Sequence, residues 1–371
     1  MWFRLLELLR GGARAKPAPP PDTPPSEDSR PPSPERSGVP VDWRRIYADQ
    51  RPYIFPPARG APRPPETLPP GYRLLGSEGP EFFDPAVQHY RCAFRHAEPV
   101  FVQAEDRQRW LAARQRVMDH VLGLIARSPW QSRLVLRGSA LLRTQLGAAA
   151  RRPGDIDWVV LPPALAANSP SGREIIDDIA RLVGSRPQVD AGTTIDAERY
   201  AIGAIWTYER AEGRRLTFTW SVDGLPPGTL QQDFVYGEPL AEAPAETAVT
   251  LGSGATVELL AASPALSLCW KLLWLGNDIH PQGKDLYDAV LLAECTRLPP
   301  GLLEAVVTQA AAAAREQPMP LPPEIDEWDV DWENFRREYP DVAGDVEDWK
   351  RRLAVALARS PDRDPASLTA R

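Results

Sequence analysis

Two aspartates separated by one residue, Asp155 and Asp157, open an apolar run that continues to Val160. Side chains two residues apart on a strand point to the same side, so this spacing predicts two carboxylates on one face of a sheet. Hard divalent cations prefer such oxygen ligands. Upstream, Gly138 and Ser139 form a turn between an apolar strand pattern and a short helical pattern, and a helix that begins there offers free N–H groups to an anion. Together the motifs predict a site for a metal ion and a nucleotide.

A third acidic residue is needed if the pair is to hold two cations, since two carboxylates leave most ligand positions to water. Asp233 is the candidate, because it lies in the strand-like segment LQQDFVY. Alternation places it on the face opposite Leu230 and Phe234, and the strand can lie beside the one that carries Asp155 and Asp157. An inward acidic residue on such a strand is costly without a cation or hydrogen bonds.

Five arginines and no acidic residue occur between Gln131 and Gly154. The chain has a net charge of −7, so any attraction for nucleic acid must come from a local basic patch such as this one. Exposed arginines on a solvated helix and loop are the alternative, but the lack of compensating acids favours a surface that faces an anion. The arginines that could reach phosphate or an RNA acceptor are Arg137, Arg143, Arg151 and Arg152.

Elements that would position these residues follow from hydrophobic periodicity and turn signals. Helical spacing predicts helices at 103–127, 173–183, 264–275, 284–294 and 301–314, and at 332–358 with a break at Pro340. Strand-like runs occur at 133–137, 155–161, 200–208, 215–222, 230–236 and 256–260, and DGLPPG marks a turn between the fourth and fifth of these. Mixed α/β sequence followed by helices predicts a small sheet domain with a helical domain packed against it.

Proline dominates the sequence from Lys16 to about Pro70. Proline at that density removes backbone donors, so we expect residues 1–80 to be disordered apart from a short amphipathic helix at the N-terminus. The predicted domains are then a nucleotide-site domain at 81–262, a helical domain at 263–360 and a disordered tail at 361–371. No apolar run approaches membrane-spanning length, and the three cysteines are scattered, so we expect a cytoplasmic protein without stable membrane insertion, disulfide framework or zinc site.

The order of these motifs is similar to that of a known enzyme superfamily. A strand, a Gly-Ser turn, a helix, a DxD strand and a later aspartate strand resemble the DNA polymerase β-like nucleotidyltransferases. The segments LRGSALL, GDIDWVV, LQQDFVYGEPL, SPALSLCWKLLWLG and QGKDLYDAVLL narrow the resemblance to the AbiEii/AbiGii-type toxin family of nucleotidyltransferases. It covers roughly residues 103–294. Members of that family include toxins of toxin–antitoxin and phage-defence systems.

The resemblance implies an α+β fold, with a polymerase β-like core built on a small mixed sheet and a C-terminal helical domain. It also implies an NTP substrate and Mg²⁺, with a two-metal site. The residues it implies for nucleotide binding are Gly138, Ser139, Lys271, Lys284 and Asp285. Those it implies for the metal are Asp155, Asp157 and Asp233, and Lys271 completes the catalytic set. An alternative for Lys284 is a surface ion pair with Asp288, four residues along the same helix.

The activity implied is transfer of an NMP from an NTP to a macromolecular hydroxyl, with the 3′ end of tRNA as the acceptor and a cognate antitoxin as a partner. Modification of a protein hydroxyl is a second hypothesis, and a non-catalytic nucleotide-binding scaffold is a third. The acidic, Trp-containing segment 324–349 has two interpretations. Its aromatic residues Trp332, Phe335 and Trp349 pack inward under a solvated face, or the segment folds over the arginine loop and limits access of RNA.

Overall fold

The computed structural model describes residues 72–74, 81–83, 93–96, 99, 101–205, 212–278, 281–313 and 325–359. The predicted disordered region, apart from β1 at 72–74, lies outside the described residues, as do its N-terminal helix and the predicted tail at 361–371. The predicted domain boundaries remain predictions. Three short strands, β1 (Tyr72–Leu74), β2 (Glu81–Phe83) and β3 (Ala93–His96), form a small antiparallel sheet of their own in the order β1-β3-β2.

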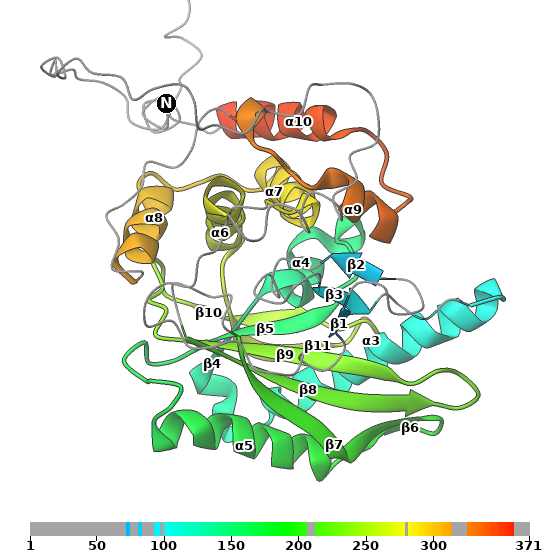
Figure 1. Cartoon of the computed structure of the whole chain (residues 1–371). Coiled ribbons are helices and arrows are strands. Elements are labelled where there is room, and N and C mark those ends of the chain that lie inside the picture. Colours follow the sequence, from blue (N-terminus) through cyan, green and yellow to red (C-terminus); the bar gives the residue numbers. More distant parts are fainter. Residues whose placement is uncertain are drawn as a thin grey trace, which may run out of the picture.

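A mixed sheet of eight strands forms the centre of the described structure (Figure 1). Its order is β10-β11-β4-β5-β9-β8-β7-β6, and only the β11–β4 and β5–β9 neighbours run parallel. The strands are β4 (Leu134–Arg137), β5 (Asp155–Val160), β6 (Gln188–Asp190), β7 (Thr193–Ile205), β8 (Glu212–Val222), β9 (Gly228–Tyr236), β10 (Ala245–Thr250) and β11 (Thr256–Ala261). The α+β class and the mixed sheet are therefore as predicted, but the sheet is larger than the expected small one.

Helices cover both faces of this sheet (Figure 1). Two of them, α3 (Ala104–Ala126) and α5 (Pro170–Gly184), lie on one face. On the other are α4 (Gly138–Leu146), α6 (Pro264–Asn277), α7 (Gly283–Cys295), α8 (Leu302–Ala313), α9 (Trp332–Glu338) and α10 (Val346–Ala358). None of the helices in the described ranges is long and apolar enough to cross a membrane.

Local sequence explains where the elements near the site begin. Ser263 caps α6 by accepting a hydrogen bond from the Leu266 N–H, and Pro264 occupies the first turn, where no backbone donor is needed. The DGLPPG turn joins β8 to β9. At its end, Gly228 packs so closely on the Trp220 ring that an added Cβ would lie 2.2 Å from a ring carbon. This close approach helps to fix the pairing register of β8 and β9.

Candidate functional site

Four charged residues lie in one row across four neighbouring strands. In the strand register, Arg137 on β4 lies opposite Asp157 on β5, and Asp157 lies opposite Asp233 on β9. Asp233 in turn lies opposite Arg215 on β8. Directly paired residues project from the same face of a sheet, so two carboxylates stand side by side between two guanidinium groups. Asp155 projects from that face too, two residues before Asp157. We call Arg137, Asp155, Asp157, Asp233 and Arg215 the sheet cluster.

The Gly-Ser turn meets the sheet cluster at its acidic centre. Gly138 has a φ of +71°, and a Cβ at this position would lie 1.9 Å from Oδ2 of Asp157. Only glycine therefore fits at this first position of α4, beside the Asp157 carboxylate. The Ser139 hydroxyl donates a hydrogen bond to Oδ1 of Asp155 at 3.1 Å. The structure thus brings together the four residues predicted for phosphate and metal binding in this part of the chain.

Negative charge is crowded at Asp157. The residue keeps some exposure, but protein surrounds its carboxyl group, and burial, with repulsion from Asp155 and Asp233, raises its pKa to about 8. Arg137 and Lys271 oppose this rise. A carboxylate that is so difficult to ionise gains most from an added cation, because a cation stabilises the charged form.

Asp233 has a guanidinium partner that sequence reasoning missed. Arg215 Nε donates to Oδ1 of Asp233 at 2.8 Å and its NH2 group donates to Oδ2 at 2.7 Å, with both residues buried. In the part of the chain that the structure describes, no three His, Cys, Asp or Glu side chains are arranged to hold one metal ion. Hard oxygen ligands and excess negative charge still suit a divalent cation at Asp155 and Asp157, with Asp233 beside them turned to Arg215.

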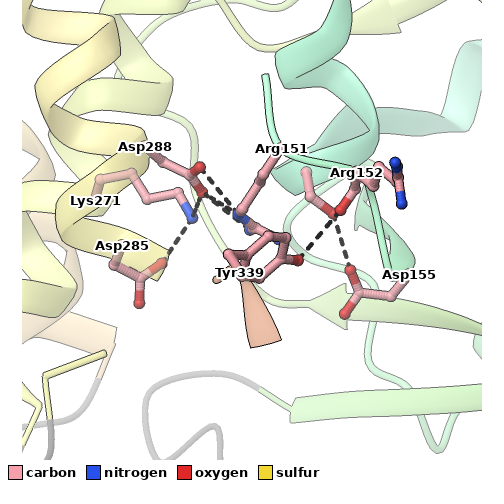
Figure 2. A network of polar contacts seen from close by, with 8 residues as sticks. Arg151, Arg152, Asp155, Lys271, Asp285, Asp288 and Tyr339 are labelled. Atoms are coloured by element: carbon pink, nitrogen blue, oxygen red, sulfur yellow. Dashed lines mark hydrogen bonds and ion pairs between the residues drawn. The ribbon is translucent and has the colours of Figure 1, made fainter. Parts of the chain in front are cut away.

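A second buried cluster joins α6 and α7 to the loop before β5 (Figure 2). The Lys271 ammonium lies 2.7 Å from Asp285 and 3.0 Å from Asp288, and Arg151 makes a bidentate pair with Asp288. We call these four residues the helix cluster. Burial alone would lower the pKa of Lys271, but the two aspartates raise it above its usual value. Burial would likewise raise the pKa of Asp288, but Arg151 and Lys271 hold it below its usual value.

Arg137 is enclosed rather than solvated. Its NH1 group lies 2.9 and 2.8 Å from the two carboxylate oxygens of Glu238, and its guanidinium lies 5.1 Å from the Trp270 ring and 5.8 Å from the Trp274 ring. The Lys271 ammonium is also 5.0 Å from the Trp274 ring. Cations over indole faces are attracted by the ring quadrupole. Arg137 thus links the Gly-Ser turn to α6, which carries Lys271.

The other predicted residues divide into two groups. Asp285 lies in the helix cluster with Lys271, whereas Lys284 is half-buried beside it. The surface pair considered for Lys284 does not form among the described residues, because Asp288 is fully buried and is held by Arg151 and Lys271. Arg143 is half-buried and Arg152 is exposed, so these two of the four arginines have side chains that solvent reaches.

The C-terminal segment packs inward and also touches the arginine loop, residues 147–154. Trp332, Phe335 and Trp349 are buried, as the first interpretation of this segment predicts. The Tyr339 hydroxyl donates to the carbonyl oxygen of Arg152 at 3.4 Å and lies beside Arg151. From α7, the Tyr287 hydroxyl donates to the Ala149 carbonyl at 3.0 Å. Limited access of RNA remains a hypothesis.

A mixed sheet that presents a Gly-Ser turn, a DxD strand and a neighbouring third aspartate defines the nucleotidyltransferase class of site. The family model described as nucleotidyl transferase AbiEii toxin, type IV toxin–antitoxin system, matches residues 120–357. The chain belongs to this family, and it is a nucleotidyltransferase. The match runs from α3 to α10 and includes both buried clusters. No curated protein matches the sequence.

Proposed function

We propose that this nucleotidyltransferase depends on Mg²⁺ and moves an NMP from an NTP to the 3′ end of tRNA, with release of pyrophosphate. We also propose that it acts in the cytoplasm as a toxin that a cognate antitoxin restrains, in line with the family's description. One observation carries the proposal. The Gly138 turn approaches Asp157 so closely that only a glycine fits there, and Asp157 is crowded by two further carboxylates. Such a place favours a cation that a phosphate chain can share.

Each residue at this point has a defined task in the proposal. Asp155 and Asp157 hold the cation, and Asp233 completes the site and orients the acceptor hydroxyl. When held by Asp155 and Asp157, Mg²⁺ would supply positive charge that offsets the negative charge developing during attack on the α-phosphorus. Gly138 and Ser139 hold the triphosphate at the start of α4, where backbone N–H groups are free for an anion.

Lys271 supplies positive charge next to the metal pair. It already acts on Asp157, whose pKa it lowers, and it stays protonated because Asp285 and Asp288 raise its own pKa. A fixed cation in a site that excludes water is worth more than one in solution, because no reorganisation is needed when charge develops. In this proposal Asp285 and Lys284 line the nucleotide side of α7.

The acceptor would approach over the solvent-accessible arginines. Arg143 and Arg152 are the candidates for phosphate contacts with tRNA, since Arg137 and Arg151 would first have to leave Glu238 and Asp288. Exchange of an arginine for a neutral residue at a phosphate contact weakens binding across sequences and reduces the salt dependence. These two residues therefore offer a test of the acceptor that does not involve the metal site.

A labelling experiment tests the activity. The protein is incubated with Mg²⁺ and each α-labelled NTP, together with total tRNA or with cell lysate. We expect label at the 3′ end of tRNA in the wild type and none in Asp157→Asn. Asp178→Asn is the control, because Asp178 pairs only with Arg181 at the surface of α5 among the contacts described. Label in protein would support modification of a protein hydroxyl instead, and label in neither would support a non-catalytic scaffold.

A further inference from the structure

Arg215 occupies the carboxylate of Asp233, the third acidic residue of the sheet cluster, so that its oxygens are not available to a cation. Its side chain grips both oxygens of Asp233 from the neighbouring strand, and the two side chains are only 10% and 5% exposed. A fork-to-fork pair of this kind is among the strongest polar contacts in proteins. The oxygens that would complete a second cation site are therefore occupied by a cation that belongs to the chain itself.

Charge in the sheet cluster is consistent with this arrangement. When ionised, Asp155, Asp157, Asp233 and the nearby Glu238 carry four negative charges, and Arg137 and Arg215 carry two positive ones. One divalent cation at Asp155 and Asp157 balances the remainder. A second would make the cluster positive unless Arg215 moved away from Asp233 or a nucleotide brought further negative charge.

We propose that Arg215 is an exchangeable counter-ion which holds Asp233 in the cation-free protein and must release at least one of its oxygens before a second divalent cation can bind. This inference rests on the proposed function and deepens it. Arg215 is a positioning residue, because it acts through Asp233. This proposal implies that the two cations bind in sequence. The first binds to Asp155 and Asp157, and the second competes with the Arg215 guanidinium for Asp233.

The inference is tested on the full chain by measuring the binding of Mn²⁺ alone. Binding is monitored by the decrease in the electron spin-resonance signal of free Mn²⁺. We expect the wild type to bind one Mn²⁺ more tightly than a second. Arg215→Met should tighten the second site at least tenfold, and Arg215→Lys, which keeps the charge but loses the fork, should tighten it less. Arg214→Met is the matched control, because it removes the same charge one residue away. Arg214 pairs with Glu212 and Asn168, outside the sheet cluster.

Thermal unfolding separates this role from a purely structural one. Without cation, Arg215→Met should melt below the wild type, since Asp233 then lacks its buried partner, and Mn²⁺ should restore most of the loss. An equal loss with and without Mn²⁺, or unchanged second-site affinity in both Arg215 variants, would overturn the proposal. If Arg215→Met does not fold, Arg215→Lys decides by the same two measurements.

Failure of the underlying function gives a different result. If the wild type binds no Mn²⁺, or binds it equally well as Asp157→Asn, the metal site itself is wrong and the counter-ion proposal falls with it. If Mn²⁺ binding depends on Asp157 but not on Arg215, only the counter-ion proposal is overturned.

Discussion

The sheet cluster and the helix cluster both bury several charges within one small protein, yet they balance them differently. In the helix cluster, Arg151 and Lys271 meet Asp285 and Asp288, so two cations face two anions. In the sheet cluster, acidic groups are in excess, and the pKa of Asp157 rises to about 8. A balanced cluster needs nothing from outside the chain.

The difference separates two tasks that charged residues perform near an active site. Balanced ion pairs fix geometry, and here they tie the loop before β5 to α6 and α7. An unbalanced group is held in an unfavourable state by the fold around it, which is a common property of sites that bind ions or perform chemistry. We therefore expect substitutions in the sheet cluster to affect activity first and those in the helix cluster to affect stability first.

The largest effect is expected for Asp157→Asn. Transfer should fall at least about 10³-fold, equivalent to about 4 kcal/mol, because the variant loses a proposed metal ligand at the reacting phosphate. The free energy of unfolding should stay level or rise, since repulsion from Asp155 and Asp233 disappears. Initial rates of NMP transfer and urea unfolding measure the two quantities. An active variant would remove Asp157 from the metal site.

The same type of substitution in the helix cluster should have the opposite profile. Asp288→Asn leaves Arg151 and Lys271 buried beside a neutral amide, so we expect a loss of about 3–5 kcal/mol in the free energy of unfolding. Lys284→Ala, one turn earlier on α7 and half-buried, is the control and should change stability by no more than about 0.5 kcal/mol. Urea unfolding checks both variants. A loss in Asp288→Asn as small as the one expected for Lys284→Ala would show that the cluster adds little stability.

The pH dependence of stability should have opposite signs in the two clusters. The folded pKa of Asp157, about 8, lies above its ordinary value of 3.8, so the folded protein keeps a proton that the unfolded chain has released. This stabilisation is complete below about pH 4 and is lost as the pH rises through 8, at up to about 1.4 kcal/mol per unit. The pKa of Asp288 is lowered, so its contribution is present above the unfolded pKa and is lost in acid.

Urea unfolding between pH 5 and 8 tests the sign. We expect wild-type stability to fall with pH more steeply than that of Asp157→Asn, and added Mn²⁺ to flatten the wild-type curve because a cation favours the ionised carboxylate. Identical slopes in wild type and variant would contradict the raised pKa. Asp178→Asn, on the surface of α5, should keep the wild-type slope.

Sequence reasoning located the acidic half of the sheet cluster because that half depends on local rules. The DxD spacing and the alternation in LQQDFVY place Asp155, Asp157 and Asp233 on one face, and the parallel pairing of β5 and β9 confirms that they are neighbours. The contact of Arg215 with Asp233 depends on the pairing register of β8 with β9, which no local pattern gives. The sequence indicated only that β8 alternates and that the DGLPPG turn joins it to β9, which does not fix the residue opposite Asp233.

The strands that the sequence did not predict depend on long-range packing. The segments that became β6 and β10 have few buried apolar residues, and their strand pairing comes from neighbours that are already in place. The helices were predicted closely, since their apolar spacing is local. Lys271 and Asp285 were predicted as nucleotide-site residues. Their ion-pair partners were not, because the bidentate pair of Arg151 with Asp288 joins segments 137 residues apart and leaves no local pattern in the sequence.

The smallest effect is expected where the C-terminal segment meets the arginine loop. Tyr339→Phe removes a long hydrogen bond to the Arg152 carbonyl, at 3.4 Å, and the contact of the hydroxyl with Arg151, so we expect a loss of about 1 kcal/mol in the free energy of unfolding. If the segment limits access to the site, transfer to tRNA should become faster while the KM for the NTP stays unchanged. Tyr287→Phe is the comparison, because its 3.0 Å bond holds the same loop from α7 instead. Equal rates in both variants and the wild type would leave the C-terminal segment with a packing role only, with no effect on access to the site.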